Sequence, residues 1–342
     1  MNSFWKTLYI GTVVIELGVM SFYGYTVYRK KQIEKNVLGV TSVNPIKKEN
    51  LIFPPDAKLK YFYESKPNTE EKDQRGWLPY TATYTINSDS LNERFDYSIE
   101  KQQNVFRIIT LGDSFTFGHC VNTTDNWPEQ LENSLNTKLK CKNIQKFEVI
   151  NLGGAGYDIE YIVHRYKIRG MKYQPNLILW LESGTGFIRY YEEMNQLAEM
   201  CEATKSADIS QLELNDGDPY NEYACWNLSE SETMKKNDGI IGMNKLNVFW
   251  DNFYRSKGNT PFVYMLFSYI EDNHIAKAKK WTDNKLNTML YTGIPNIYEK
   301  NGTLPDWHPN AKGHKIIAND VFQYLLKNNI IPCESSLPEN LQ

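Results

Sequence analysis

The sequence predicts an α/β protein whose parallel sheet is covered by helices on both faces. Short apolar runs recur at 105–111, 147–152, 177–181 and 261–267, and such runs are typical of parallel strands buried on both sides. Stretches with apolar residues at helical spacing separate them. Strands that alternate with helices indicate a parallel sheet, and ligands of such sheets bind beyond the carboxyl ends of the strands.

The first element is an apolar run at 7–28, which is long enough to span a bilayer as a helix. No small-x-small cleavage site follows it, which favours an uncleaved anchor over a removed signal peptide or a buried soluble helix. Glu16 lies in the middle of the run, where a charge costs about 3 kcal/mol unless a partner relieves it. We expect residues 1–31 to form a single-pass transmembrane anchor.

Residues 32–79 are expected to form a linker, because the segment after the anchor is polar and contains Pro45, Pro54 and Pro55. The folded domain is expected at 80–330. Its first strand is predicted from a period of two in the apolar residues Tyr80, Ala82, Tyr84 and Ile86.

Helices are predicted between the apolar runs. The first has apolar residues at steps of four from Trp127, with Asn126 as a possible cap and Pro128 in its first turn. The polar, acidic stretch near 203–240 lacks periodicity and is interpreted as an insertion. The further predicted helices cover 158–171, 188–201, 243–254 and 310–326.

Charge and cysteine content exclude several functions. The net charge of −3 gives no long-range attraction to nucleic acid, so no nucleic-acid partner is expected. None of the five cysteines form a CxxC pair, which argues against a zinc ribbon or a thioredoxin-type centre. Cys201 and Cys225 are candidates for a disulfide, and isolated reduced thiols are the alternative.

A serine on a tight turn follows the first predicted core strand, in Gly112-Asp-Ser-Phe-Thr-Phe-Gly118. Ser114 would be exposed there at the edge of the sheet. A hydroxyl is a weak nucleophile until a base takes its proton, so this interpretation requires a histidine elsewhere. The alternative is an ordinary turn, in which Asp113 and Ser114 satisfy backbone groups.

His308 is the candidate base. It lies in Asp306-Trp-His-Pro-Asn, directly before the predicted last helix, and Asp306 is close enough in sequence to fix its tautomer. A histidine taken alone is more often structural, and His314, within the helix, is interpreted as a packing residue. His119, His164 and His274 receive no role.

Together these motifs resemble those of the SGNH/GDSL hydrolases, over roughly residues 80–328. Gly112-Asp-Ser with Thr116 and Gly118 is similar to the first block of that family, and Asn151-Leu-Gly-Gly-Ala-Gly156 to the second. The resemblance implies a three-layer α/β/α sandwich of the flavodoxin-like type. It also implies a nucleophile at Ser114, a base at His308 and an orienting carboxylate at Asp306. The oxyanion donors would be the N–H groups of Ser114 and Gly156, with Gly154 as the alternative.

The sequence departs from the family at the oxyanion asparagine. The corresponding stretch, 181–187, contains no asparagine, and losing such a donor can lower the rate by about 10²–10³. The hydroxyl of Ser183 or Thr185 is the candidate replacement. The single residue between Asp306 and His308, where two are commoner, is a smaller departure.

The resemblance implies a serine esterase that removes O-acetyl or other acyl groups from a carbohydrate or lipid. Two alternatives stay open, namely an O-acyltransferase for a polysaccharide and a non-catalytic glycan-binding protein. No metal or organic cofactor is needed for the implied mechanism, and the sequence has no Walker loop, dinucleotide fingerprint or HExxH.

Two arguments about membrane orientation conflict. Four basic residues between 29 and 35 outweigh Lys6, which by the positive-inside rule would keep the domain in the cytoplasm. Related anchored hydrolases face outward, and on that ground we expect an extracytoplasmic domain.

Overall fold

A computed structural model describes residues 51–52, 59, 62–187 and 240–333. The predicted anchor at 1–31, the predicted helix at 188–201 and nearly all of the predicted insertion lie outside the described residues. Within the described ranges, no helix has both the length and the apolar character needed to cross a membrane.

The chain divides into two units. One comprises Met1–Asn44 and Arg75–Pro79, and its described part is a turn in which the Leu78 N–H donates to the Arg75 carbonyl at 3.0 Å. The other comprises Pro45–Gln74 and Tyr80–Gln342 and contains the sheet, the helices and the candidate site.

Five parallel strands form the central sheet, in the order β6-β5-β7-β8-β9. Counted along the chain this order is 2-1-3-4-5, that of a doubly wound sheet whose order reverses between β5 and β7. The four apolar runs in the sequence form β5 to β8, so the predicted parallel sheet is confirmed. The strands are β5 (Val105–Leu111), β6 (Lys146–Asn151), β7 (Leu177–Glu182), β8 (Phe262–Phe267) and β9 (Thr288–Ile294).

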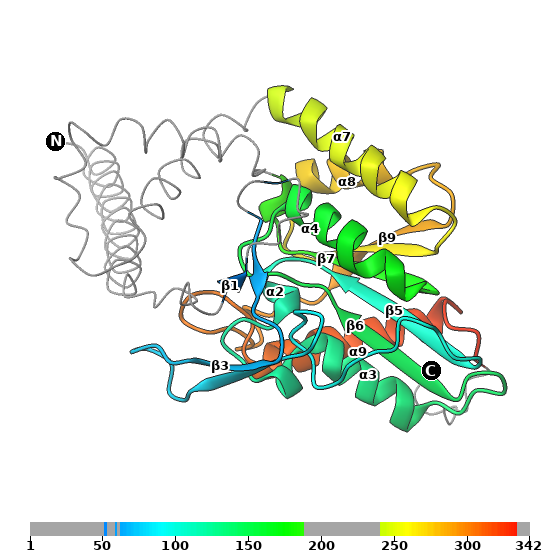
Figure 1. The fold of residues 1–342 in the computed structure, drawn as a ribbon. Coiled ribbons are helices and arrows are strands. Elements are labelled where there is room, and N and C mark those ends of the chain that lie inside the picture. Colours follow the sequence, from blue (N-terminus) through cyan, green and yellow to red (C-terminus); the bar gives the residue numbers. More distant parts are fainter. Residues whose placement is uncertain (1–50, 53–58, 60–61, 188–239, 334–342) are drawn as a thin grey trace, which may run out of the picture. The chain divides into compact units, whose positions relative to one another are not determined.

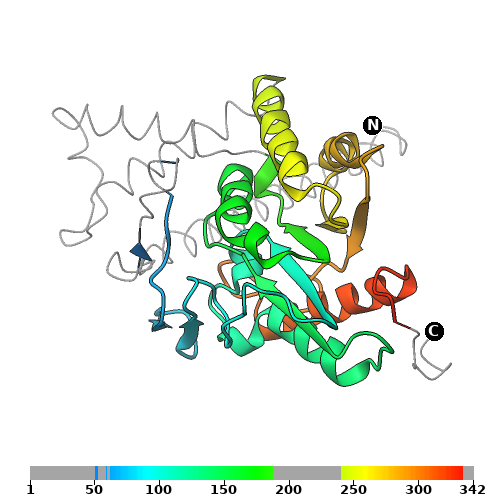
Figure 2. The same ribbon diagram turned by 45° about the vertical axis from the view of Figure 1, so that its right-hand side comes forward.

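Helices cover both faces of the sheet (Figures 1 and 2). One face carries α3 (Trp127–Lys138) and α9 (Ala311–Lys327), which pack against each other. The other carries α4 (Ile159–Arg165) and α7 (Ile240–Lys257), with α8 (Asp272–Thr282) beside β9. The three layers enclose one apolar core, in which the strands β7 and β8 are buried along their whole length.

Side-chain caps begin three of the helices where the sequence predicts them. Asn126 accepts a hydrogen bond from the Glu129 N–H at 2.9 Å, and Asp158 and Asn310 cap α4 and α9 in the same way. These caps satisfy N–H groups that have no partner within the helix. The helix predicted at 158–171 is less regular than expected, because α4 continues as a π turn (Tyr166–Gly170) and a 3-10 turn (Met171–Tyr173).

Part of the predicted linker belongs to the folded unit. The strand β3 (Thr69–Asp73) pairs antiparallel with β4 (Ala82–Ile86), and β1 (Leu51–Ile52) pairs with β2 (Glu64–Ser65). Phe62 is buried in the core, with its ring against those of Tyr157 and Tyr161. The sequence prediction therefore placed the start of the folded domain too late. The polar composition of this segment gave no sign of the buried Phe62 ring or of the pairing between β3 and β4.

A disulfide joins Cys141, in the loop after α3, to Cys333, after α9. The cysteines are 192 positions apart, and no spacing motif marks the pair. Cys201 and Cys225, the pair considered from the sequence, lie outside the described residues. Cys120 is buried and forms no disulfide with another described cysteine.

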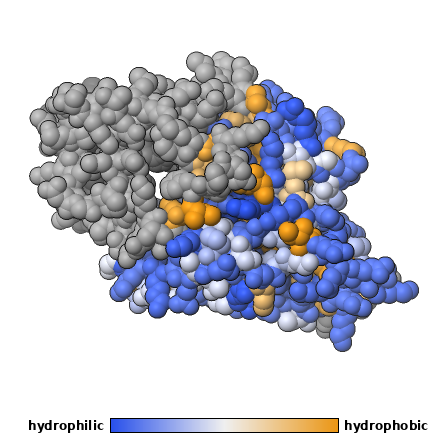
Figure 3. Space-filling view, in the orientation of Figure 1, coloured by the Kyte–Doolittle hydropathy of each residue, from blue (hydrophilic) through white to orange (hydrophobic). Residues whose placement is uncertain are grey.

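On the face drawn in Figure 3, the described residues are mostly hydrophilic, with small separate hydrophobic patches. Large apolar side chains that are exposed singly are normal on soluble domains. Trp307, however, is 52% exposed and lies between two candidate site residues.

Candidate active site

Ser114 is the first residue of α2 (Ser114–Phe117), a short helix directly after β5. The preceding residue, Asp113, caps this helix by accepting a hydrogen bond from the Phe115 N–H at 2.9 Å. Gly112 is required at the turn, because a Cβ there would collide with the Thr116 side chain and approach the Leu181 carbonyl oxygen to 2.8 Å. The turn therefore places the serine at the carboxyl edge of the sheet, beside the point where the strand order reverses.

His308 reaches this serine from the loop before α9. Its Nε2 lies 2.9 Å from Ser114 Oγ, and its Nδ1 lies 3.0 Å from Asp306 Oδ2. The His308 side chain is 24% exposed, so it is held in place but still reached by solvent. The rings of Phe115 and His119 pack against it, at centroid distances of 5.6 and 4.7 Å. The fold thus brings together three predicted residues that are up to 194 positions apart.

The Asp306 carboxyl remains an anion under ordinary conditions. Burial acts to raise its pKa, but the hydrogen bond from His308 and the charges of His308 and His119 outweigh burial, so the pKa is lowered. Its Oδ1 also accepts the His308 backbone N–H at 3.3 Å. An ionised acceptor at Nδ1 keeps the proton on that nitrogen and leaves Nε2 facing the serine as a base.

The glycine-rich segment after β6 lies against the turn that carries Ser114. The Gly154 N–H donates to the Gly112 carbonyl at 3.2 Å, and the Gly153 N–H donates to Asn151 Oδ1 at 2.9 Å. Gly154 is therefore occupied in holding the two turns together. Gly156, which has a positive φ of 77°, stays the predicted oxyanion donor from this segment.

The Ser114 N–H donates no hydrogen bond within the described residues. It is the first N–H of a helical turn, which by geometry has no partner inside the helix. This N–H is consequently available to an oxygen atom of a ligand.

The hydroxyl group of Ser183 is used differently from the sequence prediction. It donates a hydrogen bond to Asp113 Oδ2, so its proton points at the turn that carries Ser114 rather than at a ligand. The side chain of Thr185, the other candidate, lies outside the described residues. The Ser183 hydroxyl therefore does not take the place of the missing asparagine in this structure.

Glu182 is a buried acid that sequence reasoning missed. Its Oε1 accepts the N–H groups of Gly184 and Gly186 at 2.8 and 3.0 Å, and its Oε2 accepts the Tyr264 hydroxyl at 3.1 Å. Burial, with a smaller contribution from the charge of Asp113, raises the pKa of Glu182 to about 7. This carboxyl holds the loop that begins with Ser183. Its only sequence signal was an acid at the end of an apolar run.

Trp307 stands between Asp306 and His308 with a positive φ of 73°, which is rare for a bulky side chain. Its N–H donates to the Leu304 carbonyl at 3.0 Å, and its ring packs in a T-shaped arrangement with that of Tyr298, with 5.7 Å between the ring centroids. Because the backbone of Trp307 is left-handed, its ring is exposed to solvent while the side chains of Asp306 and His308 contact each other.

His119, which received no role from the sequence, also lies at the site. It belongs with Asp306 and His308 to one group of potential metal ligands, and with Asp73 and Cys120 to another. Its sequence signal was only its position five residues after the serine, which does not distinguish it from a packing residue.

The sequence matches no protein-family model, and no curated protein matches it. Several solved structures are similar in fold. A two-domain esterase active on acetylated mannans is 13% identical over 69% of this chain and 53% of its own, with a TM-score of 0.39. A family 3 carbohydrate esterase from Clostridium thermocellum is 13% identical over 67% of this chain and 100% of its own, with a TM-score of 0.37. A G-D-S-L family protein from Desulfitobacterium hafniense is 13% identical over 64% of this chain and 98% of its own, with a TM-score of 0.31.

The chain spans about half the length of the first of these esterases.

Proposed function

We propose that the protein is a serine esterase that removes acyl groups from carbohydrate esters. The observation that carries this proposal is the hydrogen-bonded series from Ser114 through His308 to Asp306, with separations of 2.9 and 3.0 Å. A nucleophile within reach of a base, which is itself oriented by a third group, is the arrangement that activates a serine.

In the proposed mechanism His308 Nε2 takes the Ser114 proton while Oγ attacks the ester carbonyl carbon. The charge that develops on the carbonyl oxygen is stabilised by the N–H groups of Ser114 and Gly156. The protonated His308 then gives its proton to the departing alcohol. A water molecule then gives a proton to His308 and attacks the acyl-enzyme in the same way. This step releases the acid and restores the serine.

The absence of an asparagine donor implies a smaller oxyanion hole than the family has. Each donor removed costs roughly 3 kcal/mol of transition-state stabilisation. We therefore expect slow hydrolysis of unactivated esters, and an advantage for substrates whose binding holds the carbonyl in place.

The exposed Trp307 ring supports a carbohydrate rather than a lipid substrate. A single flat aromatic face next to the base suits stacking against a sugar ring.

The Cys141–Cys333 disulfide supports an extracytoplasmic location for the domain. Disulfides form and persist in oxidising compartments and are rare in the cytosol. We propose that the domain faces such a compartment, held to the membrane by residues 1–31. Mass-shift labelling of free thiols in freshly lysed cells tests whether the Cys141–Cys333 disulfide forms, and with it the oxidising compartment. The chain has five cysteines, so labelling of four or more would contradict the disulfide.

Fluorophosphonate labelling of the full-length chain tests the proposed nucleophile. We expect the wild-type protein to be labelled, and Ser114→Ala and His308→Ala to lose the label. Ser256→Ala, which alters a serine on α7 that donates to the Asn252 carbonyl, is the matched control and should be labelled fully. A folded wild type that stays unlabelled would overturn the proposal in favour of a non-catalytic glycan-binding protein.

Acetate release from an acetylated oligosaccharide then separates hydrolysis from transfer. A hydrolase releases acetate in water alone. Consumption of the donor that requires an added acceptor sugar would instead establish an O-acyltransferase.

A further inference from the structure

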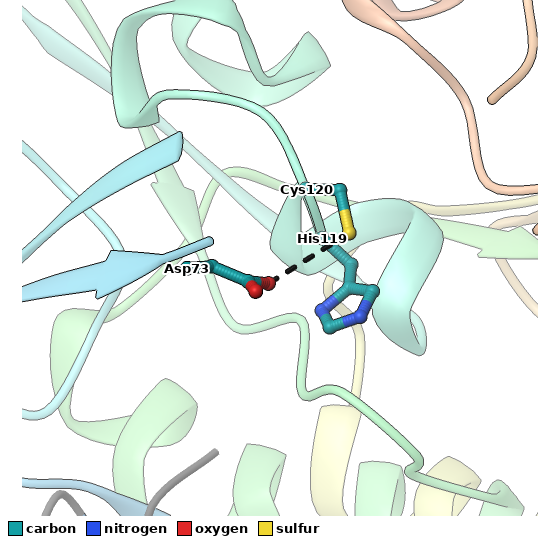
Figure 4. Close-up of side chains that lie close together, drawn as sticks. All are labelled: Asp73, His119 and Cys120. Carbon is teal, nitrogen blue, oxygen red and sulfur yellow. Dashed lines mark hydrogen bonds between the residues drawn. The ribbon is translucent and has the colours of Figure 1, made fainter. Parts of the chain in front are cut away.

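Three side chains of the kinds that bind transition metals converge beside the triad, namely those of Asp73, His119 and Cys120 (Figure 4). Asp73 is the last residue of β3, whereas His119 and Cys120 follow α2, so the fold brings two separate segments together. One potential ligand atom from each residue lies within 4.8 Å of the others.

The distances around the sulfur atom suit a tetrahedral ion. Cys120 Sγ lies 3.7 Å from Asp73 Oδ2 and 4.0 Å from Asp306 Oδ2. Zinc binds sulfur at about 2.3 Å and carboxylate oxygen at about 2.1 Å, so tetrahedral geometry places these ligand atoms roughly 3.6 Å apart. The sulfur and Asp73 Oδ2 are thus already close to the separation that two ligands of one ion require, and the Asp306 carboxylate lies beside the sulfur.

The charges at this position also favour a cation. The Cys120 side chain is fully buried and His119 is only 8% exposed. A thiol has one hydrogen, so it cannot donate fully to two carboxylates at once.

The backbone of Cys120 is held in an unusual conformation that directs the thiol into this cluster. Its φ is +63°, in the left-handed region, which costs about 1–2 kcal/mol for a residue other than glycine. Two tyrosines maintain it, because Tyr84 Oη accepts the Cys120 N–H at 2.7 Å and the Tyr80 hydroxyl donates to the Cys120 carbonyl at 3.0 Å. Strain that the surroundings enforce is concentrated at functional sites.

We propose that Asp73, His119 and Cys120 bind Zn²⁺ and that the bound ion inhibits the esterase. The thiol loses its proton to solvent and binds as thiolate, His119 binds through a neutral ring nitrogen, and Asp73 binds through a carboxylate oxygen. A water molecule takes the fourth position. Inhibition follows because the divalent charge lies beside the Asp306 carboxylate, whose Oδ2 is 4.0 Å from Cys120 Sγ, and offsets the negative charge that stabilises the His308 imidazolium.

Titration of the full-length protein with Co²⁺, a spectroscopic substitute for zinc, tests the site without requiring activity. The wild type should bind Co²⁺ with a thiolate-to-cobalt absorption band in the near ultraviolet, and added Zn²⁺ should remove the band. We expect Cys120→Ser to lose the band and to weaken Zn²⁺ binding at least 100-fold, and His119→Gln to weaken it about ten- to 100-fold.

Matched controls identify the source of the band. His274→Gln alters a histidine on α8 and should bind like the wild type, as should a Cys201→Ser/Cys225→Ser variant. Circular dichroism and thermal unfolding verify the fold of each variant. No band in the wild type, or a band that persists in folded Cys120→Ser, would refute the site.

The inhibitory effect rests on the proposed function. An assay of ester hydrolysis with and without Zn²⁺ tests this effect separately from metal binding. Zn²⁺ should lower ester hydrolysis by the wild type at least ten-fold, with recovery on chelation, and should leave Cys120→Ser active. Ser114→Ala should still bind Co²⁺, so failure of the esterase proposal and failure of the metal site are distinguishable. Metal binding without inhibition would contradict the inhibitory role alone.

Discussion

The Ser183 hydroxyl donates a hydrogen bond to the carboxylate of Asp113, the residue directly before the proposed nucleophile Ser114. Asp113 is buried, and its other oxygen caps α2 through the Phe115 N–H. One carboxylate thus ties the loop after β7 to the turn after β5. Because a hydroxyl has a single proton, Ser183 cannot make this bond and also donate to an oxyanion.

Ser183→Ala should therefore lower kcat/KM by less than about ten-fold, because it removes a positioning contact rather than an oxyanion donor, whose loss costs about 10²–10³. The measurement is hydrolysis of an activated ester alongside the rate of fluorophosphonate labelling. A loss of several hundred-fold in kcat with unchanged KM would show that Ser183 reorients toward the substrate.

Asp306→Asn should lower kcat on the order of 10³–10⁴-fold while leaving substrate binding nearly unchanged. The carboxylate accepts from Nδ1 and stabilises the imidazolium, and an amide cannot supply that charge. Steady-state kinetics at several pH values provide the check. If the Asp306→Asn protein were as active as the wild type, another group would have to orient His308.

Trp307→Ala should raise KM for an acetylated oligosaccharide about two- to tenfold, which corresponds to losing an aromatic contact of about 0.5–1.5 kcal/mol. Trp307→Phe should retain much of the affinity, since it keeps a flat ring. Hydrolysis of a small aryl acetate, which has no sugar to stack, is the internal control. Equal losses on both substrates would indicate that the side chain only supports the loop between Asp306 and His308.

Glu182→Gln should change how stability depends on pH. The folded-state pKa of about 7 lies above the ordinary 4.5, so the folded protein binds this proton more tightly than the unfolded chain. The contribution of Glu182 to stability is therefore greatest below pH 4.5 and is lost as the pH rises to about 7, a difference of roughly 3 kcal/mol. The glutamine cannot ionise, so its unfolding free energy relative to wild type should rise between pH 5 and pH 8. Urea unfolding at pH 5 and pH 8 measures this. The same difference in unfolding free energy between the variant and the wild type at both pH values would contradict the prediction.

Cys141→Ser/Cys333→Ser should destabilise the domain by about 2–5 kcal/mol, because the disulfide closes a very long loop and restricts the unfolded chain. Denaturant unfolding with and without reductant measures the difference. The wild type in reductant should match the double variant, whereas a wild type unaffected by complete reduction would show that the bond contributes nothing.

Local sequence patterns predicted the strands that are buried on both faces and the helices that bury one apolar face. The apolar runs of β5 to β8 and the caps Asn126, Asp158 and Asn310 are local signals, because they depend on neighbours within four residues. The edge strand β9 and the lysine-rich α8 were not predicted, since β9 is half-buried along most of its length and α8 buries few side chains.

The sequence by itself also determined the chemistry available, by placing Ser114 after a buried strand and His308 before the last helix. Only the tertiary structure decided which of these residues contact one another. The strand order, the 2.9 Å separation of Ser114 from His308, the bond from Ser183 to Asp113 and the pairing of Cys141 with Cys333 all join distant segments. Such contacts follow from how helices and strands pack, and residue type and spacing leave that packing open.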